Sequence, residues 1–418
     1  MNKNKTDELP GGWVQVALND IAEILMGQSP PSETYNSEGI GLPFFQGKAE
    51  FTDLHPVAEK WCREPNKIAD AEDILMSVRA PVGTTNIANQ KCCIGRGLAA
   101  IRYNHNTKFL FYFLRLIERK LDEKGTGTTF KAISGEVLKN IDVPLPPLPE
   151  QHAIVSKIEQ LFSELDKGIE SLKTAQQQLK VYRQSVLKSA FEGKLMEKKS
   201  NWVNTTLGNI ISISSGDGLT KAARNEDGEY LVYGGNGVAG KHSEYIHEEE
   251  KLIIGRVGVH CGNAHITKPK SWITDNAFVV SFDKNIVDRK FLYNLILNLN
   301  LNKYSSSTAQ PVISQGKIYP IEISLPGKEE QHQIVQEIES RLSECDNMEA
   351  TIATSLQQAE ALRQSILKKA FEGKLLNDKE LEAVRQDSTW EPAERLLERI
   401  RAEKAVLYSE KKGRKSKA

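Results

Sequence analysis

Apolar residues recur at alternating steps of four and three along two long stretches of this chain, residues 150–195 and 330–375. The repeated positions are Ile154, Ile158, Leu161, Leu165, Leu172, Ala175, Leu179, Tyr182 and Val186 in the first stretch, and Ile334, Ile338, Cys345, Met348, Ile352, Ala359, Leu362 and Ile366 in the second. A repeat of this kind indicates a helix that buries one seam against a partner helix. Both stretches end in Phe-Glu-Gly-Lys-Leu, where Gly193 and Gly373 suit a helix C-terminus. We therefore predict two long coiled-coil helices.

The two stretches are copies of one another. At an offset of 180 residues, 24 of 46 positions are identical, which excludes chance. The segment before each stretch is duplicated too, because Trp13 and Gly27 in one match Trp202 and Gly216 in the other. The chain is therefore an internal repeat with pseudo-twofold character. If the two helices pair antiparallel, each buries the apolar stripe that the other would leave exposed.

Each long stretch is preceded by a globular unit of the α+β type. Short runs with β propensity, such as 73–78 and 251–255, alternate with turns, and an amphipathic helix follows around 108–110 and 290–292. The units agree at both ends, whereas their centres barely align, so a shared scaffold holds two divergent surfaces. The predicted organisation is a polar leader (1–12), two globular domains (13–149 and 202–328), two long helices (150–195 and 329–375), a linker (196–201), and a C-terminal amphipathic helix with a basic tail (376–418).

Composition adds few constraints. Of the 418 residues 26% are charged, and the formal net charge is zero. Lys plus Arg number 15 against 16 Asp plus Glu in residues 13–145, and 12 against 12 in residues 202–325. Nucleic-acid-binding proteins often carry excess positive charge, so such a role must rest on local patches here. The five cysteines show no Cys-x-x-Cys spacing, which is typical of reduced thiols in a cytoplasm. No apolar run reaches transmembrane length.

Two motifs resemble catalytic or cofactor sites. The segment 235–241 fits two nucleotide-binding patterns, but phosphate cradling needs its glycines to open a helix, and the P-loop needs Ser or Thr where His242 stands. A glycine-rich β-turn is the better interpretation. Residues 192–194 and 372–374 resemble half of a nuclease site, but no upstream aspartate stands in a matching frame, so helix C-caps explain them better. No His/Cys cluster supports a metal site, and no catalytic site is evident.

The order and spacing of these features resemble one family. Two divergent globular units, each followed by a near-identical helix that starts with Glu-Gln-His and ends with Ala-Phe-Glu-Gly-Lys-Leu, resemble the specificity subunit of type I restriction–modification systems. The resemblance runs from Trp13 to Leu375, and EPAERLLERIRAEK near the C-terminus also resembles tails of that family. It implies a non-catalytic subunit in which two target recognition domains, separated by antiparallel helices, each read one half of a bipartite, asymmetric DNA sequence. Duplication lets one chain imitate a dimer of DNA readers.

The resemblance also implies partners and cofactors. The partners would be double-stranded DNA, two modification subunits and restriction subunits, in the cytoplasm and without a membrane. S-adenosylmethionine, ATP and magnesium would bind to those subunits, and no cofactor to this chain. A coiled-coil adaptor that binds proteins, and a self-contained methyltransferase built around 235–240, are the alternative interpretations.

Candidate contact residues follow from chemistry and position. Arg and Lys pair with guanine, and Asn or Gln with adenine. In the first unit the candidates are Gln46, Lys48, Arg79, Thr84, Thr85, Asn86 and Arg96, and in the second the expected equivalents are Asn236, Lys241, Arg256, His260 and Asn263. Thr128, Lys131 and Gln310 lie in polar closing segments and are candidate phosphate contacts. The outward helix faces that we expect to bind modification subunits carry Gln151, His152, Phe191, Gln331, His332 and Phe371.

Overall fold

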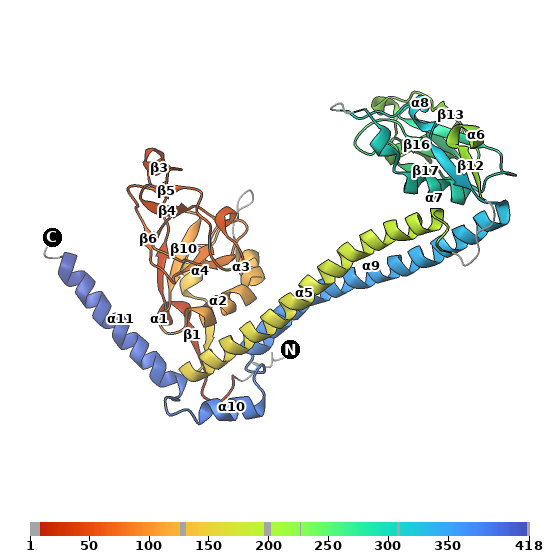
Figure 1. Ribbon diagram of the computed structural model, residues 1–418. Helices are drawn as coiled ribbons and strands as arrows, with labels where there is room; N and C mark the ends of the chain where they lie inside the picture. The colour runs from red at the N-terminus through yellow and green to blue at the C-terminus, as the bar shows by residue number, and fades with distance from the viewer. Residues whose placement is uncertain (1–8, 126–130, 196–201, 226, 307–309, 416–418) are drawn as a thin grey trace, which may run out of the picture. The chain divides into compact units, whose positions relative to one another are not determined.

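The computed structural model describes residues 9–125, 131–195, 202–225, 227–306 and 310–415. The chain forms two compact units, one from Met1–Glu170 with Leu356–Ala418 and the other from Ser171–Ser355. The division falls inside the two long helices, so each unit holds one globular domain and part of both helices (Figure 1). Among the described residues, no helix has the length and apolar character needed to span a membrane.

The first unit contains three β-sheets. A two-stranded ladder joins β1 (Val14–Ala17) antiparallel to β11 (Asp142–Leu145). A four-stranded antiparallel sheet has the order β2 (Glu23–Met26), β10 (Leu98–Arg102), β7 (Ile74–Ser77), β8 (Thr85–Ile87). A five-stranded sheet has the order β3 (Tyr35–Asn36), β5 (Trp61–Cys62), β4 (Leu42–Phe45), β9 (Cys92–Ile94), β6 (Ile68–Ala69), and β4 and β9 run parallel. The central strand β7 is buried along its whole length, which explains its unbroken apolar run.

Helix α2 (Thr107–Leu116) supplies much of the core of the first unit. The side chain of Asn106 caps it by accepting a hydrogen bond from the Phe109 amide at 3.1 Å. Its apolar face packs in one cluster with Ile154 and Ile158 of the first long helix. The remaining short helices are α1 (Leu18–Ile21), α3 (Glu118–Lys124), α4 (Gly135–Lys139), and the 3₁₀ turns η1 (Ser32–Thr34) and η2 (Lys48–Glu50).

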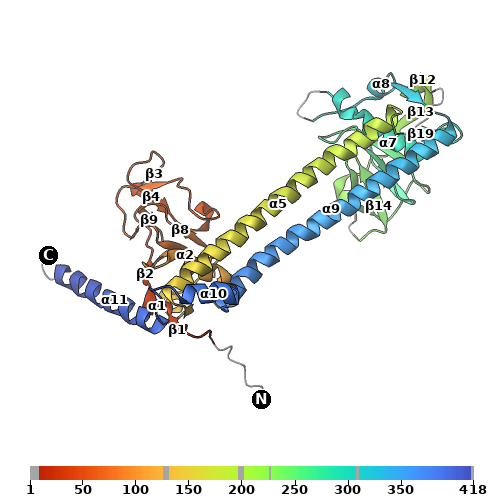
Figure 2. The same cartoon turned by 60° about the horizontal axis from the view of Figure 1, so that its bottom comes forward.

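The C-terminal residues belong to the first unit. Helix α10 (Asp378–Arg385) lies against the start of the first long helix, where Glu380 accepts a hydrogen bond from Lys157 at 2.8 Å (Figure 2). Helix α11 (Ala393–Lys415) follows, and its Leu396 and Ile400 are buried in the core of this unit. A helix therefore stands where the amphipathic helix was predicted, and it extends to Lys415 through residues predicted as a tail.

The second unit repeats this plan, with three strands instead of five in its third sheet. Its ladder joins β12 (Val203–Thr206) to β20 (Glu322–Leu325). Its four-stranded sheet has the order β13 (Ile211–Ser215), β19 (Ala277–Phe282), β16 (Leu252–Gly255), β17 (Ala264–Ile266). Its third sheet has the order β15 (Gly237–His242), β14 (Tyr230–Gly234), β18 (Ser271–Ile273), and β14 and β18 run parallel. The scaffold is shared and the centre diverges, as predicted.

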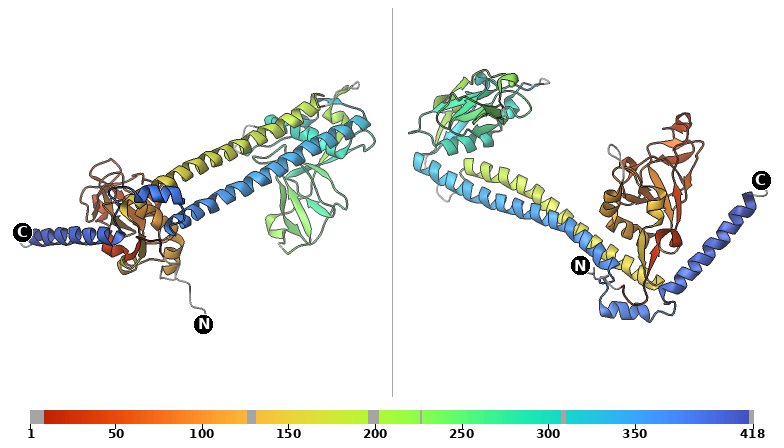
Figure 3. Two further views of the ribbon diagram at one scale, coloured as in Figure 1. Left: turned by 90° about the horizontal axis from the view of Figure 1, so that it is seen from below. Right: turned by 180° about the vertical axis from the view of Figure 1, so that it is seen from behind.

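Helix α7 (Arg289–Leu299) takes the place of α2 in the second unit. Asp288 caps it by accepting hydrogen bonds from the amides of Lys290 and Phe291 at 2.8 and 3.0 Å. Figure 3 shows α7 on the side of the domain that faces the long helices. The other helices of this unit are α6 (Leu207–Ile210), α8 (Gln315–Ile318), η3 (Lys221–Ala223) and η4 (Leu301–Tyr304).

The two long helices, α5 (Leu148–Phe191) and α9 (Lys328–Phe371), are antiparallel. In the first unit Arg363 of α9 forms an ion pair with Asp166 of α5. In the second unit Arg183 of α5 contacts Asp346 and Glu349 of α9 at 2.5 and 3.2 Å. As residue numbers rise along α5, the paired numbers fall along α9. The predicted antiparallel pair is confirmed.

Burial of the predicted seam is uneven. Positions near the helix ends are buried in the globular domains, among them Ile158 and Ile338 at 0% exposure. In contrast, Tyr182, Met348 and Leu362 are 44–53% exposed. The repeat therefore predicted the helices correctly, and away from the domains the seam is buried at some positions, such as Cys345, Ile352 and Ala359, and exposed at others.

Both long helices end at a left-handed glycine, as predicted. The φ angles of Gly193 and Gly373 are 66° and 68°. The amide of Lys194 donates to Ser189 at 2.9 Å and that of Lys374 to Lys369 at 2.8 Å. These bonds satisfy carbonyls that the last turn would leave without a partner. The Phe-Glu-Gly-Lys-Leu sequence is therefore a helix terminus and not half of a nuclease site.

Candidate nucleic-acid interface

A tryptophan–glutamate contact, buried in the first unit and part-buried in the second, holds each domain on its long helix. In the first unit the indole N–H of Trp13 donates to Glu150 at 2.7 Å. In the second unit Trp202 donates to Glu330 at 2.9 Å. Each glutamate comes from the Glu-Gln-His sequence in the first turn of the helix. The two copies of this sequence therefore fix the start of each domain in the same way.

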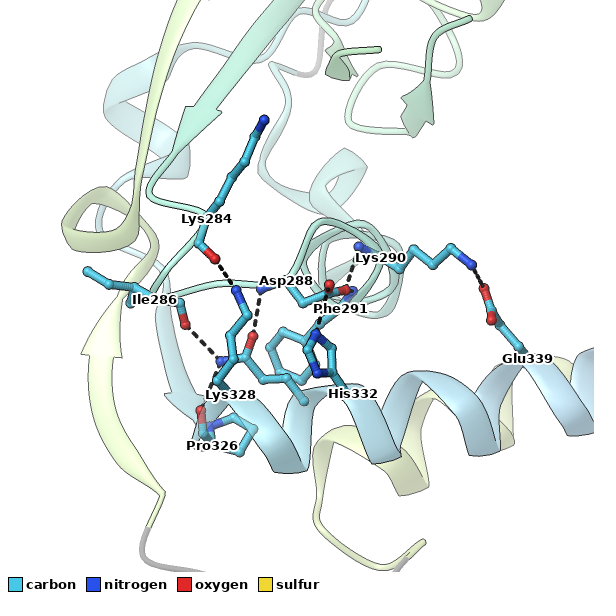
Figure 4. A network of polar contacts seen from close by, with 10 residues as sticks. Lys284, Ile286, Asp288, Lys290, Phe291, Pro326, Lys328, His332 and Glu339 are labelled. Carbon is cyan, nitrogen blue, oxygen red and sulfur yellow. Dashed lines mark hydrogen bonds and ion pairs between the residues drawn. The ribbon is translucent and has the colours of Figure 1, made fainter. Parts of the chain in front are cut away.

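The glutamine of the same sequence is also an internal contact. The side chain of Gln151 accepts a hydrogen bond from the Tyr103 hydroxyl at 3.0 Å. That of Gln331 accepts one from the backbone amide of Asp288 at 2.8 Å. Both glutamines are 0% exposed, so they join the helix to the segment that leads into α2 or α7. An exposed charge pair strengthens this junction in the second unit, where Lys290 and Glu339 lie 2.6 Å apart (Figure 4).

These contacts correct part of the predicted partner surface. Gln151 and Gln331 do not face outward, and Phe371 is buried with its ring 5.1 Å from that of Phe109. Phe191 is half-buried, with its ring 5.3 Å from that of Phe291. The prediction was wrong for Gln151, Gln331 and Phe371, because the domains cover these positions, and it stays a prediction for Phe191.

The two histidines of the Glu-Gln-His sequences remain exposed. His152 lies 3.3 Å from the Asn106 side chain, and His332 lies 3.4 Å from Asp288 (Figure 4). Both therefore contact the N-cap residue of α2 or α7 and remain exposed.

Most of the predicted DNA contacts of the first unit lie on loops at one end of its sheets. Backbone hydrogen bonds connect these loops: the amide of Gly95 donates to Phe45 at 2.8 Å, and that of Val78 donates to Gly97 at 2.9 Å. The amide of Ala80 donates to the closing segment. We call this set, residues 46–48, 78–84, 95–97 and 131–133, the first loop edge.

The second unit has the same connections at corresponding places. The amide of Thr274 donates to Tyr233 at 2.8 Å, and that of Arg256 donates to Asn276 at 2.9 Å. The amide of Gly258 donates to the closing segment. We call residues 234–236, 256–263, 274–276 and 310–313 the second loop edge. The structure therefore brings together residues that are separated along the sequence.

The first loop edge carries cations without carboxylate partners. Lys48, Arg79 and Arg96 are exposed and form no ion pair among the described residues. Lys131 differs, because its ammonium lies 3.0 Å from Asp122 and lowers the pKa of that carboxyl group. Gln46 is exposed on the same edge. Unpaired cations can contact phosphate or the guanine edge at little electrostatic cost.

The second loop edge carries more neutral polar groups. Asn236, His260, Asn263 and Gln310 are exposed. Arg256 is half-buried, with its guanidinium 5.4 Å from the centre of the Phe278 ring. A hollow of about 360 Å³ on this edge is lined by Asn236 and Gln310, and also by Asn276 and Arg224, which the sequence analysis missed. Only the alignment of the two units strand by strand reveals these positions.

The arginines of the two edges are not equivalent, contrary to the prediction. By the hydrogen-bond pattern, Val78 of the first unit is equivalent to Arg256 of the second. Arg79 is equivalent to Val257, since isolated bridges join Arg79 to Ala132 and Val257 to Val312. A shift of one residue turns a side chain to the opposite face of an extended segment. The two units therefore present arginine on different faces.

Several candidates have no free polar group on these edges. The Asn86 side chain is buried, and it accepts from the Thr52 amide at 3.1 Å and donates to the Thr52 carbonyl at 2.7 Å. Thr85 is buried as well, and the Thr84 hydroxyl donates to Glu118 at 2.6 Å. Their placement argues against base contacts. Lys241 is exposed but pairs with Leu231, at the far end of its hairpin from the turn. Thr128 lies outside the described residues.

The glycine-rich segment 235–241 is part of a β-hairpin. It connects β14 to β15, with Gly237 at a φ of 87°, and no helix follows it. The β-turn interpretation is confirmed, and the glycines do not form the helix-opening cradle that phosphate binding needs. Among the described residues, no group of three His, Cys, Asp or Glu side chains is placed to hold a metal ion. All five cysteines are buried, free thiols.

Comparison with known proteins agrees with this duplicated architecture. The family model of the type I restriction modification DNA specificity domain matches residues 10–174 and again residues 199–358. The StySPI type I restriction enzyme specificity subunit of Salmonella potsdam is 26% identical over 477 aligned positions, which cover 99% of this chain and 100% of that protein. The MjaX protein of Methanocaldococcus jannaschii, also named as such a subunit, is 42% identical over 201 residues, 47% of this chain and 46% of its own length.

A solved structure shares the fold. It comes from work described as the structural basis underlying complex assembly and conformational transition of the type I R-M system. The TM-score is 0.70 at 20% identity, over 88% of this chain and all of the other.

Proposed function

Because the chain belongs to the type I restriction modification DNA specificity family, we propose that its two loop edges each read one half of a bipartite DNA sequence. The chain is a non-catalytic specificity subunit that directs the adenine methylation or restriction carried out by partner subunits. The adaptor alternative has no support from the family match. The observation that carries the proposal is the repetition of one scaffold beneath two chemically different edges.

Double-stranded DNA meets these edges through both charge and base contacts. The cations Lys48, Arg79 and Arg96 suit phosphates or guanine, whereas the amides of Asn236 and Gln310 suit adenine. Because the units differ at equivalent positions, their half-sites differ in sequence, and the target is asymmetric. Since the domains carry no excess of positive charge, tight binding requires the partner subunits to supply part of the affinity.

Two modification subunits, one for each repeat, complete the complex in this proposal, and restriction subunits join it. These partner subunits bind S-adenosylmethionine, ATP and magnesium. The exposed His152 and His332 occupy the same place in each repeat, as two identical partners require.

Sequencing of methylated adenines tests the proposal. In a strain that expresses the chain with its modification partner, we expect methylation at a single bipartite motif. Replacement of residues 13–149 by the corresponding domain of a relative should change one half of that motif and leave the other intact. Change in both halves, or methylation without sequence preference, would refute the assignment of one half-site to each unit.

A further inference from the structure

In each loop edge two loops touch, and one of them carries an amide side chain. The loop that carries it differs between the two units. In the first unit Gln46 stands opposite Gly97, and in the second the equivalent residues are Gly234 and Asn276. A Cβ at Gly97 would lie 2.2 Å from the Gln46 carbonyl, so no side chain fits there. In the second unit the amide side chain lies on the other loop, because Gly234 stands in place of Gln46 and Asn276 in place of Gly97.

Asn276 stands in the hollow of the second loop edge beside a second asparagine. Asn236 and Asn276 are both exposed, and neither side chain has a hydrogen-bond partner among the described residues. An unpaired carboxamide offers an NH2 donor group and a carbonyl acceptor in a single plane. This pair of groups matches N7 and N6 of adenine in the major groove.

The surrounding charge favours a base contact over a phosphate contact. Next to Asn276 the second edge carries Asp275, where the first edge carries Arg96. Likewise, Asn236 takes the place of Lys48. Over all residues of the two edges, the formal charge is +4 on the first (Lys48, Arg79, Arg96 and Lys131) and zero on the second (Arg256 and Asp275). The second edge, even with Arg224 in the lining of its hollow, therefore attracts phosphate less strongly than the first, whereas contact with a neutral base edge needs no such charge.

We propose that Asn276 reads an adenine in the half-site of the second unit. Asn236, which lines the same hollow, lies beside it at the same base step. The inference rests on the proposed function, and it adds the base type and the residue. The first edge, with cations at the equivalent positions, reads a different base there.

Asn276→Ala tests the proposal in the complex with the modification subunits. Competition binding with duplexes substituted at each position of the second half-site should show that the variant loses discrimination at one adenine, by about 5- to 150-fold, the range of a good bidentate contact. The first half-site should be read as before. Asn285→Ala is the matched control, because Asn285 is an exposed turn residue of the same unit that lies outside the hollow.

A modified base separates the possible outcomes. Replacement of that adenine by 7-deazaadenine, which lacks the N7 acceptor, should weaken the wild-type complex and leave the Asn276→Ala complex unchanged. Equal weakening of the variant on all duplexes would overturn the proposal and make Asn276 a phosphate contact. Unchanged discrimination would overturn it as well. If the wild-type complex shows no sequence preference at all, the proposed function itself fails.

Discussion

Glu150 connects the start of the first domain with the C-terminal segment. Its carboxylate is 1% exposed in terms of side-chain area, and it accepts hydrogen bonds from the indoles of Trp13 at 2.7 Å and Trp390 at 3.0 Å. Arg385 lies 3.6 Å away. Glu150→Ala would leave the buried indole N–H of Trp13 and the part-buried indole N–H of Trp390 without an acceptor. At about 1.5–3 kcal/mol for each hydrogen bond to a charged group, the loss is about 3–6 kcal/mol.

The duplicated chain supplies its own comparison. Glu330, the copy of Glu150, is half-exposed and accepts the indole of Trp202. The C-terminal segment lies in the first unit, so Glu330→Ala should cost less, about 1–3 kcal/mol. For a unit of this size, 1 kcal/mol shifts the melting temperature by roughly 2–4 °C. We therefore expect a shift of about 6–24 °C for the first unit with Glu150→Ala, and about 2–12 °C for the second unit with Glu330→Ala.

Hydrogen exchange read by mass spectrometry on the full chain with its partner distinguishes the units. Glu150→Ala should lower protection in the peptides of β1, β11 and α11. Trp390→Phe, which keeps the ring but removes the indole N–H, should cost about 1–3 kcal/mol in the wild-type background and almost nothing in Glu150→Ala. Equal costs of Trp390→Phe in both backgrounds would refute the role of Glu150 as the shared acceptor.

Two further predictions concern single side chains. Burial lowers the pKa of His265, so protonation on unfolding should reduce the stability of the second unit as pH falls below about 6.5. His265→Asn introduces the residue found at the equivalent position of the first unit, Asn86, and should make the stability depend less on pH in pH-jump unfolding; an unchanged slope would contradict this prediction. Gly373→Ala should destabilise the first unit by more than about 1–2 kcal/mol in thermal unfolding, because the left-handed φ disfavours alanine and the new methyl group would lie 2.2 Å from Pro10; a neutral effect would contradict the assigned helix terminus.

The sequence predicted the parts of the fold that occur twice in the chain. Periodicity located both long helices, and the identity of the copies showed that Trp13 and Trp202 begin equivalent domains. The role of the Glu-Gln-His sequence was not predictable. Its glutamine is polar and lies near a helix start, which favours an exposed position, yet Gln151 is fully buried because Tyr103 satisfies it. Only tertiary contacts distinguish these cases.

The sequence predicted which turns form the candidate site, but not which residues of the two units are equivalent. The turns that carry Gln46, Arg79 and Arg96 do meet at one edge. However, sequence spacing alone could not show that Val78, and not Arg79, corresponds to Arg256, because the centres differ in length. Buried Asn86 was selected for its chemistry, although that same hydrogen-bonding capacity is used by the backbone at Thr52.

The arrangement of each domain explains how one scaffold can hold two different edges. In the first unit residues 95–97 precede β10, whereas Tyr103 and Asn106, which contact the long helix, follow it. In the second unit residues 274–276 precede β19 in the same way. Five residues of strand span about 16 Å. The edge that we propose reads DNA is thus separated by a whole strand from the contacts that hold the domain. Substitutions at the loops can therefore change the base that is read while the Trp–Glu and glutamine contacts keep the domain in place on its helix.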